Sequence, residues 1–203
     1  GGDVAVHAIG DLATTHVLDA IEKARARFPG PKRDRVEHVQ LMHPADFARF
    51  RNMDVTASCQ PVHLHTDMLV AEKKWGPDRC KYGYAWKSML KAGIKVQFGS
   101  DAPVEHINPL LSFHAAIARQ NPAGEPKVGW FPGERLTLEE TFHAFTVVPA
   151  WTSRREERLG VLAPGKLADL TVFGEDLSAL EPAKLPAAHV EMTIVGGEVA
   201  YRN

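Results

Sequence analysis

Three side chains that can bind a metal ion stand at the ends of short apolar runs. His7 and His38 each end a run that reads as a β-strand, and Asp101 ends another. Imidazole and carboxylate groups suit zinc, manganese or iron, and catalytic sites of this kind leave positions open for water. A single histidine at a strand end more often packs or forms a hydrogen bond. The order His, His, Asp along the chain is more specific and predicts one shared metal site.

Four β-like runs must position these side chains. They cover residues 3–8, 35–39, 54–59 and 94–101, and each of the first three leads into a helix-like segment. This alternation predicts an α/β fold of parallel units with right-handed crossovers. The carboxyl ends of such strands share one face, so residues far apart in sequence can meet at one ion. Helices are expected at 12–28, 44–53, 85–92 and 110–119, with a polar excursion at 60–84 and a further helix that begins at a Thr137–Glu140 capping box.

The pattern changes near Glu157. A strand is expected at 169–173, and a hairpin at 190–201 turns at Gly196-Gly197. Three short strands are too few for an independent sandwich. We therefore expect them to pair with strands outside this chain or to pack on a partner.

Composition excludes several classes of protein. The 203 residues carry 24 basic and 25 acidic side chains, so a net charge of −1 gives no footprint for nucleic acid or anionic lipid. No apolar run reaches the roughly 20 residues that span a bilayer. The two cysteines, Cys59 and Cys80, have no CxxC spacing, which excludes a cysteine-based zinc site, and free thiols fit a reducing cytoplasm. A start at Gly1 without methionine leads us to expect a piece of a longer protein.

Six segments together resemble the YtcJ-like branch of the metal-dependent amidohydrolase superfamily. The resemblance covers essentially the whole chain in the family's order. It implies a TIM (β/α)8 barrel, of which residues 1–156 form the C-terminal half with strands five to eight, and residues 157–203 form part of a small β-sandwich. The six segments are residues 7–11, 37–40, 57–61, 98–104, 130–140 and 162–170.

The resemblance also implies a mechanism. It makes His7, His38 and Asp101 the metal ligands of strands five, six and eight, with zinc as the first choice and one or two ions in the intact enzyme. Such a metal lowers the pKa of a bound water toward about 7. Asp101 would take the proton of that water and deliver it to the leaving amine. Similar enzymes cleave N-substituted formamides and other amides, so the implied reaction is hydrolysis of an amide C–N bond.

The sequence departs from the family pattern in its missing first half. The strand-one His-x-His pair and the strand-four ligand are absent; His63-Leu64-His65 has the right spacing but matches the strand-seven loop. A half-barrel has two open sheet edges. We expect this chain alone to be inactive, with the N-terminal half of the same protein or a second copy as its partner.

Other polar residues near the site are candidates for substrate contact. His63, Asp67 and His106 are expected to face a small amide substrate, or else to lie in ordinary polar loops. Glu37 and Gln40 flank His38 and are expected to orient it. Two other functions stay open: a related hydrolase of esters, lactones or phosphoesters, and a metal-binding remnant without activity. The tryptophans Trp75, Trp86 and Trp130 either line a pocket or pack locally.

Overall fold

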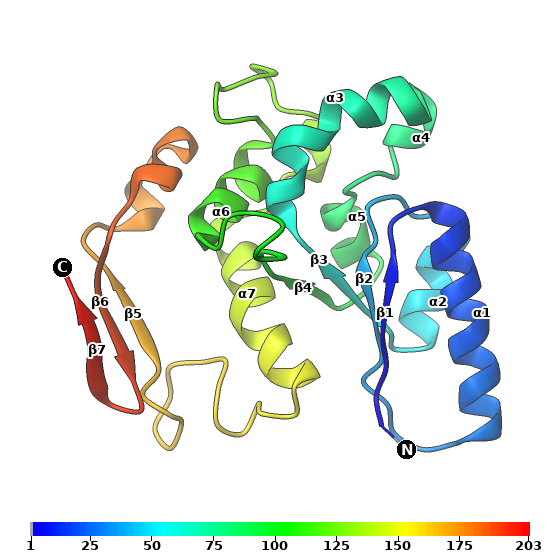
Figure 1. Ribbon diagram of the computed structural model, residues 1–203, viewed down its shortest axis with the longest axis horizontal. Coiled ribbons are helices and arrows are strands. Elements are labelled where there is room, and N and C mark those ends of the chain that lie inside the picture. The colour runs from blue at the N-terminus through cyan, green and yellow to red at the C-terminus, as the bar shows by residue number, and fades with distance from the viewer. Residues whose placement is uncertain (1) are drawn as a thin grey trace.

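The first part of the chain is built on a parallel sheet. The computed structural model describes residues 2–203, and its first sheet has the order β1-β2-β3-β4 (Figure 1). The four strands were all predicted from the sequence, and their parallel registers confirm the α/β class. Their bounds are Ala5–Ala8 for β1, Arg35–His38 for β2, Thr56–Cys59 for β3 and Val96–Phe98 for β4.

Helices connect and cover these strands close to the positions expected. The capping box is confirmed: the Glu140 amide donates to Thr137 Oγ1 at 3.1 Å, and the Thr137 amide donates to Glu140 Oε2 at 2.8 Å. Within residues 2–203, no helix is both long and apolar enough to cross a bilayer. The helices are α1 Asp11–Arg27, α2 Asp46–Asn52, α5 Trp86–Lys91, α6 Pro109–Ala118 and α7 Leu138–Thr152.

The segment at 60–84 corrects a prediction. The polar excursion expected there is instead a 3₁₀ turn, η1 at Pro61–His63, followed by α3 at Leu64–Trp75 and α4 at Pro77–Cys80. The prediction was wrong because α3 buries only a narrow stripe, with Leu64, Met68 and Ala71 inside and mostly polar residues between them. The buried stripe packs α3 against the core, and η1 follows directly after β3, at the carboxyl edge of the sheet.

The last part of the chain forms a second, antiparallel sheet. Its order is β5-β6-β7, with β5 at Leu170–Phe173, β6 at Val190–Val195 and β7 at Glu198–Arg202. The predicted Gly196-Gly197 turn is confirmed, and both glycines have positive φ. In Figure 1, α6 and α7 stand between the two sheets. Two 3₁₀ segments join β5 to β6: η3 at Leu177–Ala179, and η4 at Pro182–Ala187, which packs on α6.

The three tryptophans mentioned above pack around one buried tyrosine. Their rings lie 6.4, 5.8 and 6.1 Å from that of Tyr84, for Trp75, Trp86 and Trp130 respectively. Arg119 is fully buried beside them and donates to the carbonyls of Tyr84 at 2.7 Å and of Trp130 at 2.8 Å. This arrangement favours local packing as the role of the tryptophans, and Trp86 also packs against Phe98, the last residue of β4.

Candidate metal centre

The three predicted ligands all lie at the carboxyl edge of the parallel sheet. His38 ends β2 opposite Ala8 of β1, so His7 stands one position back on the neighbouring strand. The rings of His7 and His38 meet edge to face with centroids 4.4 Å apart. Asp101 follows β4 at the same edge, since the strands are parallel. The three positions thus share one edge of the sheet, and their role as metal ligands stays a prediction.

The backbone at two of these positions is unusual. His38 has φ 77° and Asp101 has φ 60°, in the left-handed region that residues other than glycine adopt rarely. Val39, next to His38, also has a positive φ of 47°. Such conformations cost on the order of 1–3 kcal/mol each, and they cluster at functional sites where the surrounding structure enforces them. The left-handed backbone conformations thus fall on His38 and Asp101 themselves, at the ends of their strands.

A compact group of possible ligand atoms forms at this edge. It contains His38 and Asp101 together with His63, which the sequence did not predict as a ligand. One nitrogen of His38, one nitrogen of His63 and one oxygen of Asp101 all lie within 4.8 Å of one another. His63 Nε2 is 3.2 Å from Asp101 Oδ2, and the rings of His38 and His63 have centroids 5.9 Å apart. Two imidazoles and a carboxylate are a donor set that zinc and similar cations accept. His7 lies beside this group, against His38.

The electrostatics of His38 suit a neutral ligand. Burial lowers its pKa, and the neighbouring His7 lowers it further, while Asp101 acts in the opposite direction. A neutral imidazole has a lone pair free for a metal. His38 Nδ1 is buried and meets no geometric hydrogen-bond partner within residues 2–203, although the nearby Gln60 side chain acts to raise the pKa of His38. Leaving such an atom unpaired costs about 1–3 kcal/mol, so the site fits a group that the protein atoms alone do not supply.

The remaining candidates have other contacts. Asp67 accepts a hydrogen bond from the Tyr84 hydroxyl at 2.6 Å, and exposed His106 accepts one from the Asn108 amide at 3.0 Å. Substrate contact by Asp67 and His106 stays a prediction. Glu37, expected to orient His38, forms an ion pair with Arg35 at 2.6 Å.

The contact between Glu105 and His63 was not predicted from the sequence. Glu105 Oε1 lies 3.5 Å from His63 Nδ1, on the opposite side of the ring from Asp101. The sequence feature that could have indicated this contact is the short spacing between Asp101 and Glu105. The two residues lie in one turn, where the Val104 amide donates to the Asp101 carbonyl at 2.8 Å. A second histidine pair, His65 Nε2 and His114 Nδ1 at 3.1 Å, lies outside the group. Burial, then His114, lowers the pKa of His65 to about 4.

Comparison with known proteins places this geometry among metal-dependent hydrolases. A model of the amidohydrolase family matches residues 1–201. YtcJ, an amidohydrolase-like protein of Bacillus subtilis, is 33% identical over 99% of this chain and 38% of its own length. The N-substituted formamide deformylase of Arthrobacter pascens is 28% identical over 99% of this chain and 37% of its own length.

A solved structure has the same fold. An uncharacterised metal-dependent hydrolase of Pyrococcus horikoshii superposes with a TM-score of 0.77 and 28% identity, over 92% of this chain and 36% of that protein. The chain thus spans well under half the length of the proteins it matches.

Proposed function

The chain belongs to the amidohydrolase family, and on that premise we propose that it carries part of the metal site of an enzyme that hydrolyses an amide C–N bond. One observation carries the proposal: His38, His63 and Asp101 converge within 4.8 Å at the carboxyl edge, with His7 against His38. Zinc is the cation that this donor set favours.

We further propose that β1 to β4 are strands five to eight of a TIM barrel and that β5 to β7 belong to a small β-sandwich. A site at the carboxyl ends of parallel strands is the arrangement of barrel enzymes. In this chain β1 and β4 are the edge strands of their sheet. The N-terminal half of the same protein would pair with these edges, or a second copy would; a monomeric mass in light scattering argues against the second copy.

The residues of the site have distinct tasks in this reaction. When bound, the cation would supply a water of lowered pKa and polarise the substrate carbonyl. His7 and His38 would hold the cation through nitrogens of their imidazole rings. Asp101, whose carboxylate is partly exposed at the edge, accepts a proton from the attacking water and passes it to the departing nitrogen. Asp67 and His106 are the residues we propose to face the substrate.

The proposed substrate class is an N-substituted formamide or a similar small amide. Its support is the similarity to a relative named as an N-substituted formamide deformylase. Esters and lactones are the competing class, because the same residues serve both reactions. Turnover of a formamide series against a lactone series by the full-length protein distinguishes them, and hydrolysis of lactones alone would contradict the amide assignment.

Metal analysis tests the site itself. We expect the full-length protein to retain bound zinc after gel filtration, and His7→Ala and His38→Ala to lose it. The control is His143→Ala, which removes an exposed histidine of α7 far along the chain from the site. Zinc contents that stay equal in all four proteins would leave the proposed metal site without support.

A further inference from the structure

We propose that His63 is itself a metal ligand and that Glu105 holds its ring in the ligating orientation. This inference rests on the proposed function, because it concerns the same site. It changes the role of His63, which the sequence assigned to substrate contact, and it gives Glu105 a role as a positioning residue.

The spacing between His63 and Asp101 fits two ligands of one ion. Two donor atoms about 2.0–2.1 Å from a tetrahedral zinc lie roughly 3.3 Å apart, and His63 Nε2 is 3.2 Å from Asp101 Oδ2. His38 is the third member: one ligand atom of each of the three residues lies within 4.8 Å of those of the other two. The His63 side chain is only 11% exposed, so its ring is held at the site rather than free in solvent.

The surroundings of the His63 ring explain why a cation belongs there. A carboxylate lies beside each ring nitrogen: Asp101 near Nε2 and Glu105 near Nδ1, at 3.2 and 3.5 Å. A neutral imidazole has one N–H donor and one lone pair. Either neutral tautomer turns a lone pair toward a carboxylate, so the ring needs a positive charge at one of its nitrogens, as a proton or as a metal ion. A cation at Nε2 resolves this conflict, because Nδ1–H then donates toward Glu105 and the Nε2 lone pair binds the metal.

This arrangement matches a general pattern of metal sites. A ligating histidine almost always donates its second ring N–H to a carboxylate, carbonyl or water, which fixes the tautomer and the ring orientation. Glu105 is placed for that task by the turn after Asp101. Local structure also fixes His63: its amide donates to the Gln60 carbonyl at 3.2 Å, and the next residue, Leu64, is fully buried.

Zinc titration of the full-length protein tests the assignment. We compare the wild type with His63→Ala and Glu105→Gln, using calorimetry with a competing chelator. Glu105→Gln keeps the shape of the side chain and removes its charge, and we expect a loss of zinc affinity of about 10- to 100-fold, as for other orienting partners. His63→Ala should weaken binding by more. The matched control Glu139→Gln alters an exposed glutamate of α7 and should leave affinity unchanged.

A second readout separates ligation from a merely structural role. The visible spectrum of the Co²⁺-loaded protein reports the ligands of the ion, so His63→Ala should change it and Glu139→Gln should not. If His63→Ala fails to fold, the Glu105→Gln affinity alone decides, and a value equal to wild type overturns the proposal. Loss of zinc in His38→Ala with wild-type affinity in His63→Ala overturns the inference but not the proposed function. Wild-type affinity in both variants overturns both.

Discussion

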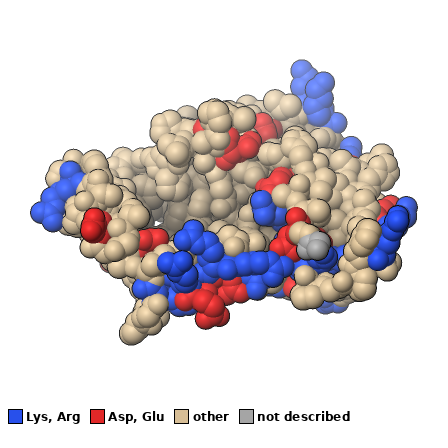
Figure 2. Space-filling view, turned by 60° about the horizontal axis from the view of Figure 1, so that its bottom comes forward, with Lys and Arg blue, Asp and Glu red and all other residues tan. Residues whose placement is uncertain are grey.

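The two ends of the parallel sheet use their polar side chains in opposite ways. At the carboxyl edge, His38, His63 and Asp101 face one another. At the amino edge, near the N-terminus in Figure 1, basic and acidic residues lie together, and Lys and Arg form a band across this face (Figure 2). The same four strands thus carry a group of ligand atoms at one end and a group of opposite charges at the other.

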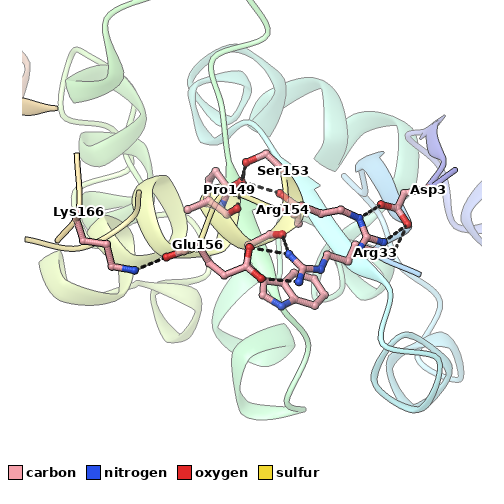
Figure 3. Close-up of polar contacts among 10 residues, drawn as sticks. Asp3, Arg33, Pro149, Ser153, Arg154, Glu156 and Lys166 are labelled. Atoms are coloured by element: carbon pink, nitrogen blue, oxygen red, sulfur yellow. Dashed lines mark hydrogen bonds and ion pairs between the residues drawn. The ribbon is translucent and has the colours of Figure 1, made fainter. Parts of the chain in front are cut away.

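At the amino edge, ion pairs connect segments that lie far apart in the sequence. Arg33 donates to both carboxylate oxygens of Glu156, at 2.8 and 2.5 Å, and also to the Trp151 carbonyl (Figure 3). Arg154 donates to both oxygens of Asp3, at 2.8 and 2.9 Å. These bonds connect the residues before β1 and β2 to the end of α7, and Lys166 extends them by donating to the Glu156 carbonyl at 2.5 Å.

The difference separates residues that stabilise the fold from residues that we propose to bind a metal ion. Asp3 and Glu156 at the amino edge each face an arginine, and the hydrogen bonds from Arg33 and Arg154 lower the pKa of Glu156 and of Asp3 to about 2. At the carboxyl edge, Asp101 and the two imidazoles offer lone pairs to the same space, and His38 Nδ1 is buried without a partner within residues 2–203. Changes at the two ends should therefore affect different properties.

Asp101→Asn gives the largest expected effect and should lower activity and zinc affinity without changing the fold. Asparagine tolerates the left-handed backbone at this position, so the fold is kept, but the amide cannot accept and pass on the proton. We expect kcat/KM of the full-length protein to fall by about 10²- to 10⁴-fold, with an unchanged Tm of the metal-free protein. Steady-state kinetics and thermal unfolding measure the two effects. A Tm that falls as far as that of an amino-edge variant would remove the distinction between the two ends.

Glu156→Gln should show the reverse behaviour. The change removes the charge that pairs with Arg33, whose guanidinium also lies over the Trp151 ring, 4.6 Å from its centroid. We expect the Tm to fall by a few degrees, with zinc affinity and turnover equal to wild type. The matched control is Asp78→Asn, because its partner Lys81 is at 2.7 Å but both side chains are largely exposed; such a pair contributes little. A weaker zinc affinity in Glu156→Gln would show that the two ends are coupled.

The carboxyl edge was more predictable from sequence than the amino edge. Polar side chains at strand ends leave a pattern, since apolar runs that end in His7, His38 and Asp101 can be read directly. The ion pairs at the amino edge leave none, because Asp3 and Arg154 lie 151 positions apart and ordinary surface charges look the same. The contacts of His63 could not be predicted either, because Asp101 and Glu105 are distant from it in sequence. Only the folded positions of η1 and of the turn after Asp101 show that the two carboxylates lie beside opposite nitrogens of its ring.

The pair of Asp3 and Arg154 gives the smallest effect, and it is visible only in acid. Hydrogen bonds from Arg154 and from the Arg33 amide lower the pKa of Asp3 from 3.8 to about 2. Above about pH 4, Asp3 is ionised in both states and its ion pair stabilises the fold in full. As the pH falls from 4 to 2, the unfolded chain takes up the proton first, so this contribution is progressively lost.

We expect Asp3→Asn to make the decline of Tm between pH 4 and pH 2 shallower than in the wild type, with only a slightly lower Tm at pH 7. Thermal unfolding across this range measures the slopes, with Asp78→Asn as the exposed control. Parallel curves for Asp3→Asn and wild type would show that this ion pair does not contribute to stability. Of the two ion pairs at the amino edge, only that of Arg33 and Glu156 would then be expected to stabilise the fold.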